Sequence, residues 1–380
     1  NIQSSWLMIE VRKAESKSEV KRFIDFPHEL YKDDIHYVPE LYMAQKDLLN
    51  KKTHPFFDHS DADFFLAYRN KQIVGRIAAI RNNNYIEYTG DLTGNFGFFD
   101  VVNDYDVAEK LFDVAVNWVK GKNLAGIMGP TNFSTNETCG VLTEGFDSPP
   151  TMMMTYNKPY YVDFIERYGF GVEMDLLSYK INTVDVPERL MRLSDRIYER
   201  LKSKGITIRK VNLKNFKQEI DDIFEVYNSA WEKNWGFVPM TKDEFRHAAK
   251  DMKSIVDPDF LLVAESESKM IGFSLTIPDM NIPLKQLKKG RLLPFGIFKF
   301  FQYKNKIDRV RIITLGVVEQ YRKLGIDAYF YMKAFEEAKN KNMEFGEASW
   351  VLENNPEMNK ALENINGKVY KKHRLYKMAL

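Results

Sequence analysis

The chain has 380 residues, 44% of them hydrophobic, so it can bury one large core or, more in keeping with its length, two domain cores. Its 55 Lys and Arg residues nearly balance its 53 Asp and Glu residues, which excludes a polycation that binds nucleic acid through overall charge. A single cysteine, Cys139, excludes an intrachain disulfide and predicts a reducing, cytoplasmic compartment. Because no apolar run approaches ~18 residues, we expect no transmembrane helix.

Two stretches of the chain read alike, which indicates a duplication. Residues 64–80 and 260–277 each have the pattern of a strand, a polar turn and a second strand with a glycine midway. The two glycines, Gly75 and Gly272, are 197 residues apart. Two half-chains of one fold are therefore expected.

Other repeated positions support the same duplication. Tyr179 and Tyr376 are also 197 residues apart. Gly97 and Gly316 are 219 apart, which an insertion of about 22 residues within 279–308 would explain. The sequence therefore predicts that each half carries its own insertion.

The predicted elements follow the same order in each half. A short strand opens each one, at 8–12 and at 207–211, and an amphipathic helix follows, clearest at 219–233. The hairpin, a strand, a helix (107–120 in the first half), a buried strand, another helix and a last strand come next. A further helix at 188–204 joins the halves. Alternating strands and helices predict an α/β fold, a mixed sheet covered by helices.

This order predicts three parts of the chain. An N-terminal domain spans 1–184, a linking helix spans 185–205, and a C-terminal domain spans 206–380. We expect the acceptor of any reaction to bind between the two halves.

Residues 315–328 are the most informative stretch. An apolar β-branched run at 310–318 leads into a short basic loop with one glycine, and a helix-forming run follows at 326–341. The first N–H groups of such a helix are unpaired, and together with the helix dipole they attract phosphate. Arg322 and Lys323 add positive charge. The pattern predicts a nucleotide-cofactor loop, with coenzyme A the favoured cofactor, while the alternative is a basic turn that binds nothing.

This loop resembles that of the GNAT superfamily of acyl-CoA-dependent N-acyltransferases, which reads Gln/Arg-x-x-Gly-x-Gly/Ala. Arg322 and Gly325 have the required spacing, and Asp327 departs from the pattern where a small residue is expected. Residues 350–356 and 359–367 also resemble the family. The resemblance implies a tandem GNAT fold of two related domains.

A fused pair with one cofactor site also resembles protein N-myristoyltransferases. Residues 26–41 and 95–99 are similar to a bacterial group of fused acyltransferases, members of which acylate sphingoid bases to give ceramides. The resemblance implies a small-molecule or lipid amine as acceptor and leaves its identity open. Residues 26–41 are expected to help close the groove for the acyl chain or the acceptor.

The resemblance also implies where acetyl-CoA or a longer acyl-CoA binds. The implied contacts lie on the strand, the loop, the start of the helix and the end of the next strand: Leu315, Val317, Val318, Gln320, Arg322, Lys323, Leu324, Gly325, Ile326, Ala328 and Asn355. Backbone N–H groups of the splayed strand would hold the thioester carbonyl, and Asn355 the pantetheine arm. An amine attacks directly, so no acyl-enzyme and no metal are expected.

Two carboxylates are candidates for the catalytic base. Glu319 ends the strand before the loop, and Glu353 ends the next one. For each, the alternative is a solvated carboxylate at a strand end. Glu363 stands where the family places a tyrosine acid, which leaves the leaving-group acid unassigned. The alternative function is therefore an inactive duplicated GNAT fold that binds a lipid or a partner.

Only the second half is expected to bind the cofactor. The matching turn of the first half, 99–109, holds four carboxylates and no basic residue. Those carboxylates are Asp100, Asp104, Asp106 and Glu109. Their charge would repel a pyrophosphate.

The two insertions differ in character. Residues 280–307 contain seven basic residues, five aromatic rings and no acidic residue. This composition fits an anionic membrane surface, which would make the protein peripheral on the inner face of the membrane. The alternative is a surface-packed insertion that covers the other half or a second subunit. Nucleic acid is disfavoured because no basic helix or stacking platform accompanies the segment.

The first-half insertion, 130–159, is polar and then rich in Met and Tyr. Its polar side chains are candidates for hydrogen bonds to an acceptor: Asn132, Ser134, Asn136 and Glu137. Met152–Met154 are candidates for an apolar channel. We expect Cys139 not to be a nucleophile, since no histidine partner is evident. His54 and His59 are expected to form an ordinary turn rather than a metal site.

Overall fold

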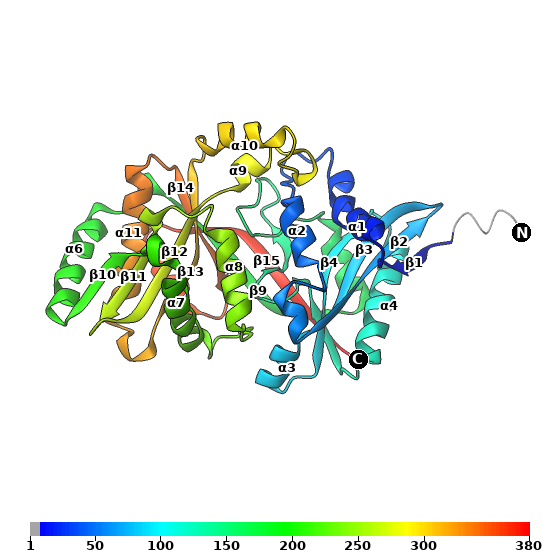
Figure 1. Ribbon diagram of the computed structural model, residues 1–380, viewed down its shortest axis with the longest axis horizontal. Coiled ribbons are helices and arrows are strands. Elements are labelled where there is room, and N and C mark those ends of the chain that lie inside the picture. Colours follow the sequence, from blue (N-terminus) through cyan, green and yellow to red (C-terminus); the bar gives the residue numbers. More distant parts are fainter. Residues whose placement is uncertain (1–7) are drawn as a thin grey trace, which may run out of the picture. The chain divides into compact units, whose positions relative to one another are not determined.

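The structure is a computed structural model that describes residues 8–380 and divides into two compact units (Figure 1). Unit 1 contains the described residues through Leu176, Asn281–Tyr303 and Lys371–Leu380, and unit 2 contains Leu177–Met280 and Lys304–Tyr370. Two of the four boundaries fall within long strands, β9 (Gly171–Asn182) and β15 (Lys368–Ala379), and the other two delimit the segment Asn281–Tyr303. This division differs from the one expected at 1–184 and 206–380, because unit 1 also takes an insertion and the end of the last strand from the second half.

Unit 1 is built on a mixed sheet. Its strands run in the order β1 (Glu10–Lys13), β2 (Asp61–Arg69), β3 (Gln72–Arg81), β4 (Thr93–Val101), β5 (Gly126–Gly129) and the end of β15. β4 and β5 are parallel, and the other neighbours are antiparallel. The insertion after β5 forms three short strands, β6 (Thr131–Asn132), β7 (Thr138–Cys139) and β8 (Val141–Glu144).

Alternation along β2 assigns the two faces of this sheet. Phe65 and Ala67 pack with α4 (Tyr105–Gly121) and α5 (Tyr160–Tyr168). Phe64 and Leu66 point to the opposite face. There they pack with α1 (Lys17–Leu30), the residues around α2 (Tyr42–Leu48) and the 3₁₀ turn η2 (Pro55–Asp58). A short helix, α3 (Asn83–Thr89), connects β3 to β4.

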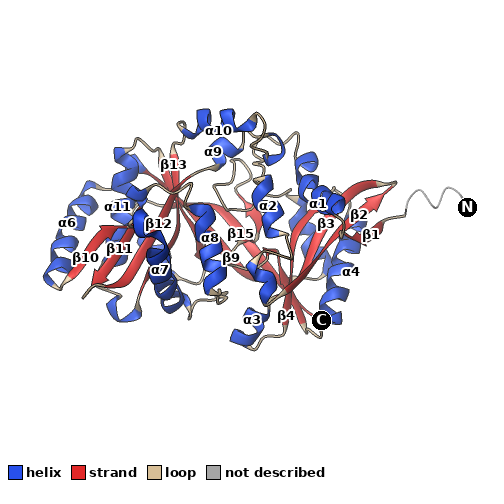
Figure 2. Cartoon of the chain, viewed as in Figure 1, coloured by secondary structure: helices blue, strands red, loops and turns tan. Residues whose placement is uncertain are grey.

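Unit 2 repeats this plan. Its sheet order is β14 (Phe345–Leu352), β13 (Arg309–Val317), β12 (Lys269–Pro278), β11 (Leu261–Ser266) and β10 (Ile206–Lys210), and only β13 and β14 are parallel. Figure 2 shows the strands flanked by helices. Helices α6 (Glu188–Ser203) and α11 (Ile326–Asn340) cover one face of the sheet. Helix α7 (Phe216–Trp231), together with α8 (Lys242–Met252), covers the other face. A last helix, α12 (Pro356–Asn364), follows β14. The mixed α/β fold expected from the sequence is confirmed.

The strand register tests the repeated glycines. Gly75 pairs with Val101 and Gly272 with Val317, so the two hairpins correspond. Gly97, however, pairs with Ala78, whereas Gly316 pairs with Phe273, one residue beyond Gly272. The predicted equivalence of Gly97 and Gly316 is therefore wrong. Gly97 lies four residues before Val101, whereas Gly316 lies directly before Val317, so the count along the sequence matched glycines at different places in the register.

Gly97 is a glycine for a local reason. A Cβ atom at this position would lie 1.7 Å from the carbonyl oxygen of Thr131, so the loop after β5 rests directly on the β4 backbone. Gly316 instead faces the rings and methyl groups of Phe273 and Ala230. The two glycines therefore serve different contacts.

Helix α6 is an integral part of unit 2. Ile197 and Leu201 are buried against Tyr329 and Phe330 of α11, in the core that also contains Val317. The helix predicted as a linker exists, and its apolar face covers the sheet that carries the loop predicted to bind the cofactor. Its packing therefore supports that loop.

Leu201→Ala should lower the free energy of unfolding by about 2–5 kcal/mol, because it leaves a cavity in a fully packed core. Leu193 lies on the same helix and is 44% exposed, so Leu193→Ala is the matched control, with an expected change within about 0.5 kcal/mol. Urea unfolding followed by circular dichroism measures both. Equal small losses in the two variants would mean that α6 only connects other elements.

Candidate functional site

The two parallel strands of unit 2 separate part-way along their length. β13 and β14 pair from Arg309 with Phe345 to Ile312 with Ala348. Beyond that point β13 continues to Val317 and β14 to Leu352 without pairing with each other. One edge of β13 is therefore left open, and it leads directly into the predicted cofactor loop.

The register shows which backbone groups face this edge. The Val318 N–H donates to the carbonyl oxygen of Ile271, 2.9 Å away, on the β12 side. Because N–H groups alternate along a strand, those of Leu315 and Val317 point to the open side. The N–H groups of Leu315 and Val317 therefore face the open side, and their contact with the cofactor remains a prediction, whereas the Val318 N–H is already used within the sheet.

The loop after β13 is partly hydrogen-bonded to itself, because the N–H groups of Tyr321 and Arg322 donate to the carbonyls of Val318 and Glu319 at 2.9 and 3.1 Å. It runs through a 3₁₀ turn, η7 (Glu319–Tyr321), and then through left-handed conformations at Lys323 (φ 65°) and Gly325 (φ 95°). Gly325 is the N-cap of α11, and within residues 8–380 no side chain caps this helix end. The Leu324 carbonyl accepts a hydrogen bond from Arg200 at 2.9 Å.

The predicted loop contacts divide into exposed and packed residues. Gln320, Arg322, Lys323 and Ala328 are exposed at the start of α11, together with Asp327. Leu324 and Gly325 are half-buried, and Ile326 is buried in the core of unit 2. The exposed residues surround uncapped N–H groups, which is the arrangement that an anion site needs.

Arg322 holds the loop against the sheet. Its Nε donates to the Val317 carbonyl at 3.2 Å and its Nη2 to the Ala230 carbonyl at 2.7 Å. These bonds use two of the five guanidinium N–H donors. Arg322 therefore positions the loop and still has donors for an anion.

The two candidate bases lie at exposed strand ends. Glu319 forms an ion pair with Lys233 at 3.1 Å, with both side chains about two-thirds exposed. Glu353 is exposed just after β14. The Asn355 side chain accepts a hydrogen bond from Met358 N and so caps α12, which positions the residue predicted to contact the cofactor arm. Their catalytic and binding roles remain predictions.

A buried polar network lies where β13 and β14 separate, and the sequence analysis missed it. The fully buried Glu347 accepts hydrogen bonds from Ser349 Oγ at 2.5 Å and from the hydroxyl of Tyr370. Arg311 donates to Ser349 Oγ at 2.8 Å. Burial and the Glu347 charge raise the pKa of Tyr370. A glutamate inside the otherwise apolar strand Phe345–Leu352 was the available signal, since such a charge is kept only with partners.

The same opening exists in unit 1, and the chain itself fills it. β4 and β5 pair only from Thr93 to Asn95 on the β4 side. Farther along β4, the Phe98 N–H donates to Asn132 Oδ1 at 2.7 Å. Helix α4 is capped by Asp104, whose carboxylate accepts from Asp106 N. In unit 1, therefore, both the strand edge and the start of the helix are hydrogen-bonded to side chains of the unit itself.

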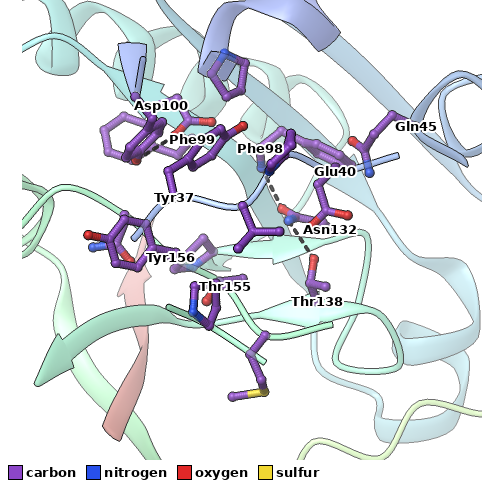
Figure 3. Close-up of a pocket in the computed structure, with 18 of the residues that line it drawn as sticks. Tyr37, Glu40, Gln45, Phe98, Phe99, Asp100, Asn132, Thr138, Thr155 and Tyr156 are labelled. Carbon is purple, nitrogen blue, oxygen red and sulfur yellow. Dashed lines mark hydrogen bonds between the residues drawn. The ribbon is translucent and has the colours of Figure 1, made fainter. Parts of the chain in front are cut away.

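Unit 1 contains a cavity of about 130 Å³ next to this filled opening (Figure 3). Its walls come from the end of α1, residues 37–48, the end of β4 and the insertion after β5. Tyr37, Glu40 and Asp100 contribute polar groups, and Phe98 and Met154 contribute apolar surface. Of the residues Met152–Met154, which were predicted to line an apolar channel, Met154 lines this cavity. Residues of the segment 26–41, which was predicted to close the groove, form one wall.

Several polar residues of the insertion bond to one another. Glu137 accepts from Ser134 N at 3.0 Å and from Ser134 Oγ at 2.7 Å, and Asn136 N donates to Ser134 Oγ. Asn132 donates to Thr138 Oγ1 as well as accepting from Phe98. These hydrogen bonds shape the loop, and contact with an acceptor remains a prediction.

His54 and His59 flank the turn η2, and Cys139 lies in the insertion after β5. His54 Nδ1 accepts from Phe56 N at 3.3 Å at the start of η2, and His59 bonds to Ser60 Oγ at 2.6 Å. Cys139 is buried in β7.

The basic insertion packs on the N-terminal unit. Arg291 forms a bidentate pair with Asp25 at 2.9 and 3.0 Å and stacks over the Tyr42 ring. Lys289 pairs with Glu29 at 2.6 Å. Gly290 has φ 67°, and a Cβ there would lie 1.9 Å from the Glu40 carbonyl. Two of the seven basic residues therefore anchor the insertion.

The remainder of the insertion exposes large apolar side chains. It contains α9 (Asn281–Leu284), a 3₁₀ turn at Lys288–Gly290 and α10 (Gly296–Lys304). Leu293, Phe295, Phe298 and Phe301 are between 58% and 77% exposed. None of the described helices is long and apolar enough to cross a membrane.

Comparisons with known proteins assign the family. No family model matches the chain. It is 34% identical to Protein YghO of Escherichia coli (strain K12) over 96% of this chain and 94% of that protein. It is also 34% identical to the bacterial ceramide synthase of Caulobacter vibrioides (strain NA1000 / CB15N) over 98% of both. The solved tandem GNAT protein from the clavulanic acid biosynthesis pathway covers 98% of both chains with a TM-score of 0.57 at 9% identity.

The chain belongs to the same family as Protein YghO and the bacterial ceramide synthase. The tandem GNAT fold expected from the loop and from the repeated element order is confirmed. The two units of this fold differ at the same two places. In unit 2 the strand edge is open and no side chain caps α11, whereas in unit 1 side chains occupy the strand edge and cap α4.

His28, which lines the unit 1 cavity, is expected to make the free energy of unfolding depend on pH. Burial lowers the pKa of His28 from 6.5 to about 4. Between those values the unfolded chain binds more protons than the folded one, so stability must rise with pH in that window. The wild type should lose about 2 kcal/mol more than His28→Asn when the pH falls from 7 to 5.

Urea unfolding at the two pH values measures this difference. Parallel curves for wild type and His28→Asn would contradict a buried, neutral His28.

Proposed function

We propose that the protein is an N-acyltransferase that moves an acetyl or longer acyl group from CoA to an amine, with CoA bound at the start of α11 in unit 2. The observation that carries this proposal is the uncapped N-terminus of α11 beside the open edge of β13. Lys323 and Arg322 add positive charge to these N–H groups. This combination fits a pyrophosphate.

The proposed chemistry is direct transfer. The N–H groups of Leu315 and Val317 would polarise the thioester carbonyl and stabilise its developing oxyanion. The amine nitrogen forms the new C–N bond as the C–S bond breaks, and the leaving thiolate takes a proton. Before the attack, a carboxylate takes one proton from the ammonium form of the acceptor and so leaves a neutral amine, with Glu319 the first candidate and Glu353 the second.

The proposed acceptor is a lipid amine of the sphingoid-base type. The relative named bacterial ceramide synthase supports this choice because it matches nearly the full chain. A ceramide is an N-acylated sphingoid base, so its synthesis fits the proposed reaction.

We further propose that α10 rests on an anionic membrane surface, where such an acceptor would be found. The exposed side chains of Leu293, Phe295, Phe298 and Phe301 support this proposal. Lys299, Lys304 and Lys306 would face the lipid phosphates.

The first test measures CoA binding and turnover. Lys323→Glu combined with Ala328→Glu should weaken CoA binding at least about tenfold, because both carboxylates would lie beside the phosphate site. Lys339→Glu reverses one charge at the other end of α11 and should leave binding within about twofold. Isothermal titration with CoA measures both.

A thiol-release assay with palmitoyl-CoA or acetyl-CoA and sphinganine or hexylamine tests the reaction. We expect acyl transfer by the wild type and its loss in the double variant. CoA binding without release for any pair would favour the alternative, a duplicated fold that binds without turnover. Undiminished CoA binding by the double variant would place the cofactor elsewhere.

The membrane proposal is tested by co-sedimentation with phosphatidylglycerol vesicles. Phe298→Ser with Phe301→Ser should reduce binding at least about tenfold, since each buried ring contributes roughly 1.5–3 kcal/mol. Val184→Ser removes an exposed apolar side chain of unit 2 and is the control. Equal binding by the double variant and wild type would contradict a membrane role for α10.

A further inference from the structure

The cavity of unit 1 holds an acidic group without a partner. Glu40 lines the cavity and is exposed. Protein atoms nevertheless surround the side chain closely enough for desolvation to raise the pKa of its carboxyl group. Within residues 8–380 the Glu40 carboxylate forms no hydrogen bond and no ion pair.

The nearest candidate cation is already paired. Arg76 donates from Nε at 2.9 Å and from Nη2 at 2.8 Å to Asp100 Oδ2, and from Nη1 at 2.9 Å to the Phe23 carbonyl. The other Asp100 oxygen accepts from the hydroxyls of Tyr31 at 3.2 Å and Tyr161 at 3.0 Å. The charges of Arg76 and Asp100 therefore cancel, and the Glu40 charge remains uncompensated.

Histidine does not supply the missing charge. His28 lies on the same cavity, with Nδ1 2.9 Å from the Tyr37 hydroxyl, and burial lowers its pKa to about 4. The imidazole is therefore neutral near pH 7. Its Nε2 is buried without a hydrogen-bond partner in the described chain. The cavity thus combines one negative charge with an unused polar atom of a neutral ring.

The remaining wall is divided between apolar and amide groups. In Figure 3, Glu40 and Gln45 lie at one side of the pocket and Tyr156 at the other. Apolar surface comes from Ile24, Pro27, Val38, Leu48, Phe98 and Met154. An occupant that carries one cationic group on an apolar body would match both parts.

The described residues do not favour a metal ion. No group of three His, Cys, Asp or Glu ligand atoms that could hold an ion includes Glu40 in residues 8–380. A volume of about 130 Å³ has room for on the order of ten water molecules, which suits an organic head group better than a bare ion.

We propose that this cavity binds an amphipathic amine through an ion pair between its ammonium group and the Glu40 carboxylate. A carboxylate that faces a cavity forms its strongest hydrogen bond with a charged donor, such as an ammonium group that reaches it directly. The apolar body of the amine lies against the Ile24 and Phe98 side of the cavity. Identifying this amine with the acyl acceptor rests on the proposed function, whereas the binding site itself does not.

Isothermal titration with hexylamine, in the absence of any CoA compound, tests the site. Glu40→Gln keeps the size of the side chain and removes its charge, and it should weaken hexylamine binding at least about tenfold. Asp33→Asn removes an exposed carboxylate from the same connection outside the cavity and is the matched control, with affinity unchanged within about twofold. Hexan-1-ol, which lacks the charge, should bind wild type and Glu40→Gln equally.

A melting experiment guards against misfolding. Glu40→Gln should melt at or above the wild-type temperature, because it relieves an uncompensated charge. Hexylamine should raise the melting temperature of the wild type and not that of the variant. Equal hexylamine affinity in Glu40→Gln and wild type, equal loss in Asp33→Asn, or lack of binding to wild type would overturn the proposal.

Failure of the site and failure of the enzyme assignment are separable. A protein that binds hexylamine through Glu40 and transfers no acyl group would refute the proposed enzyme and keep this site. A protein that transfers acyl groups with full activity as Glu40→Gln, and binds hexylamine unchanged, would refute the site alone.

Discussion

The separation of two parallel strands determines what each unit of this protein can bind. Once β13 and β14 part after Ile312 and Ala348, the backbone groups on one edge of β13 have no strand partner. Unpaired backbone groups that are shielded from water carry a large free-energy cost, so a side chain, solvent or a ligand must satisfy them. In unit 1 the Asn132 side chain does so at Phe98. In unit 2 no strand pairs with this edge beyond Ile312. Its outward N–H groups are those that we propose hold the thioester carbonyl.

The same contrast applies to the helices that follow these strands. Asp104 caps α4 with its own carboxylate, and so supplies a negative charge where a phosphate would otherwise bind. Gly325 has no side chain and leaves the start of α11 available. The duplicated fold therefore has one unit in which the start of α11 is uncapped and one unit in which a carboxylate lines a cavity. We propose ligands of opposite charge for the two units.

The insertion between β12 and β13 shows how chain order and spatial order diverge. It belongs to the second half by sequence, yet Arg291 and Lys289 fix it to carboxylates of α1 in unit 1. These pairs, together with the close approach of Gly290, hold its base in place. Phe298 and Phe301 of α10 remain exposed. The earlier part of the insertion is therefore held by ion pairs, and its later part presents exposed aromatic rings.

The sequence alone determined the features that depend on neighbouring residues. Hydrophobic period identified the hairpins and the amphipathic helices, and the Arg322–Gly325 spacing identified the loop, because these signals are local in the chain. Only the tertiary structure decided which β13 N–H groups face outward, since bulges between strands set the register. The sequence shows the unusual glutamate in the strand Phe345–Leu352, but its network includes Arg311 and Tyr370 from other strands, which local pattern does not identify. The lining of the cavity beside Glu40 likewise comes from separate segments. The transfer of residues 371–380 to unit 1 likewise follows from pairing with β5, a choice made between strands about 250 residues apart.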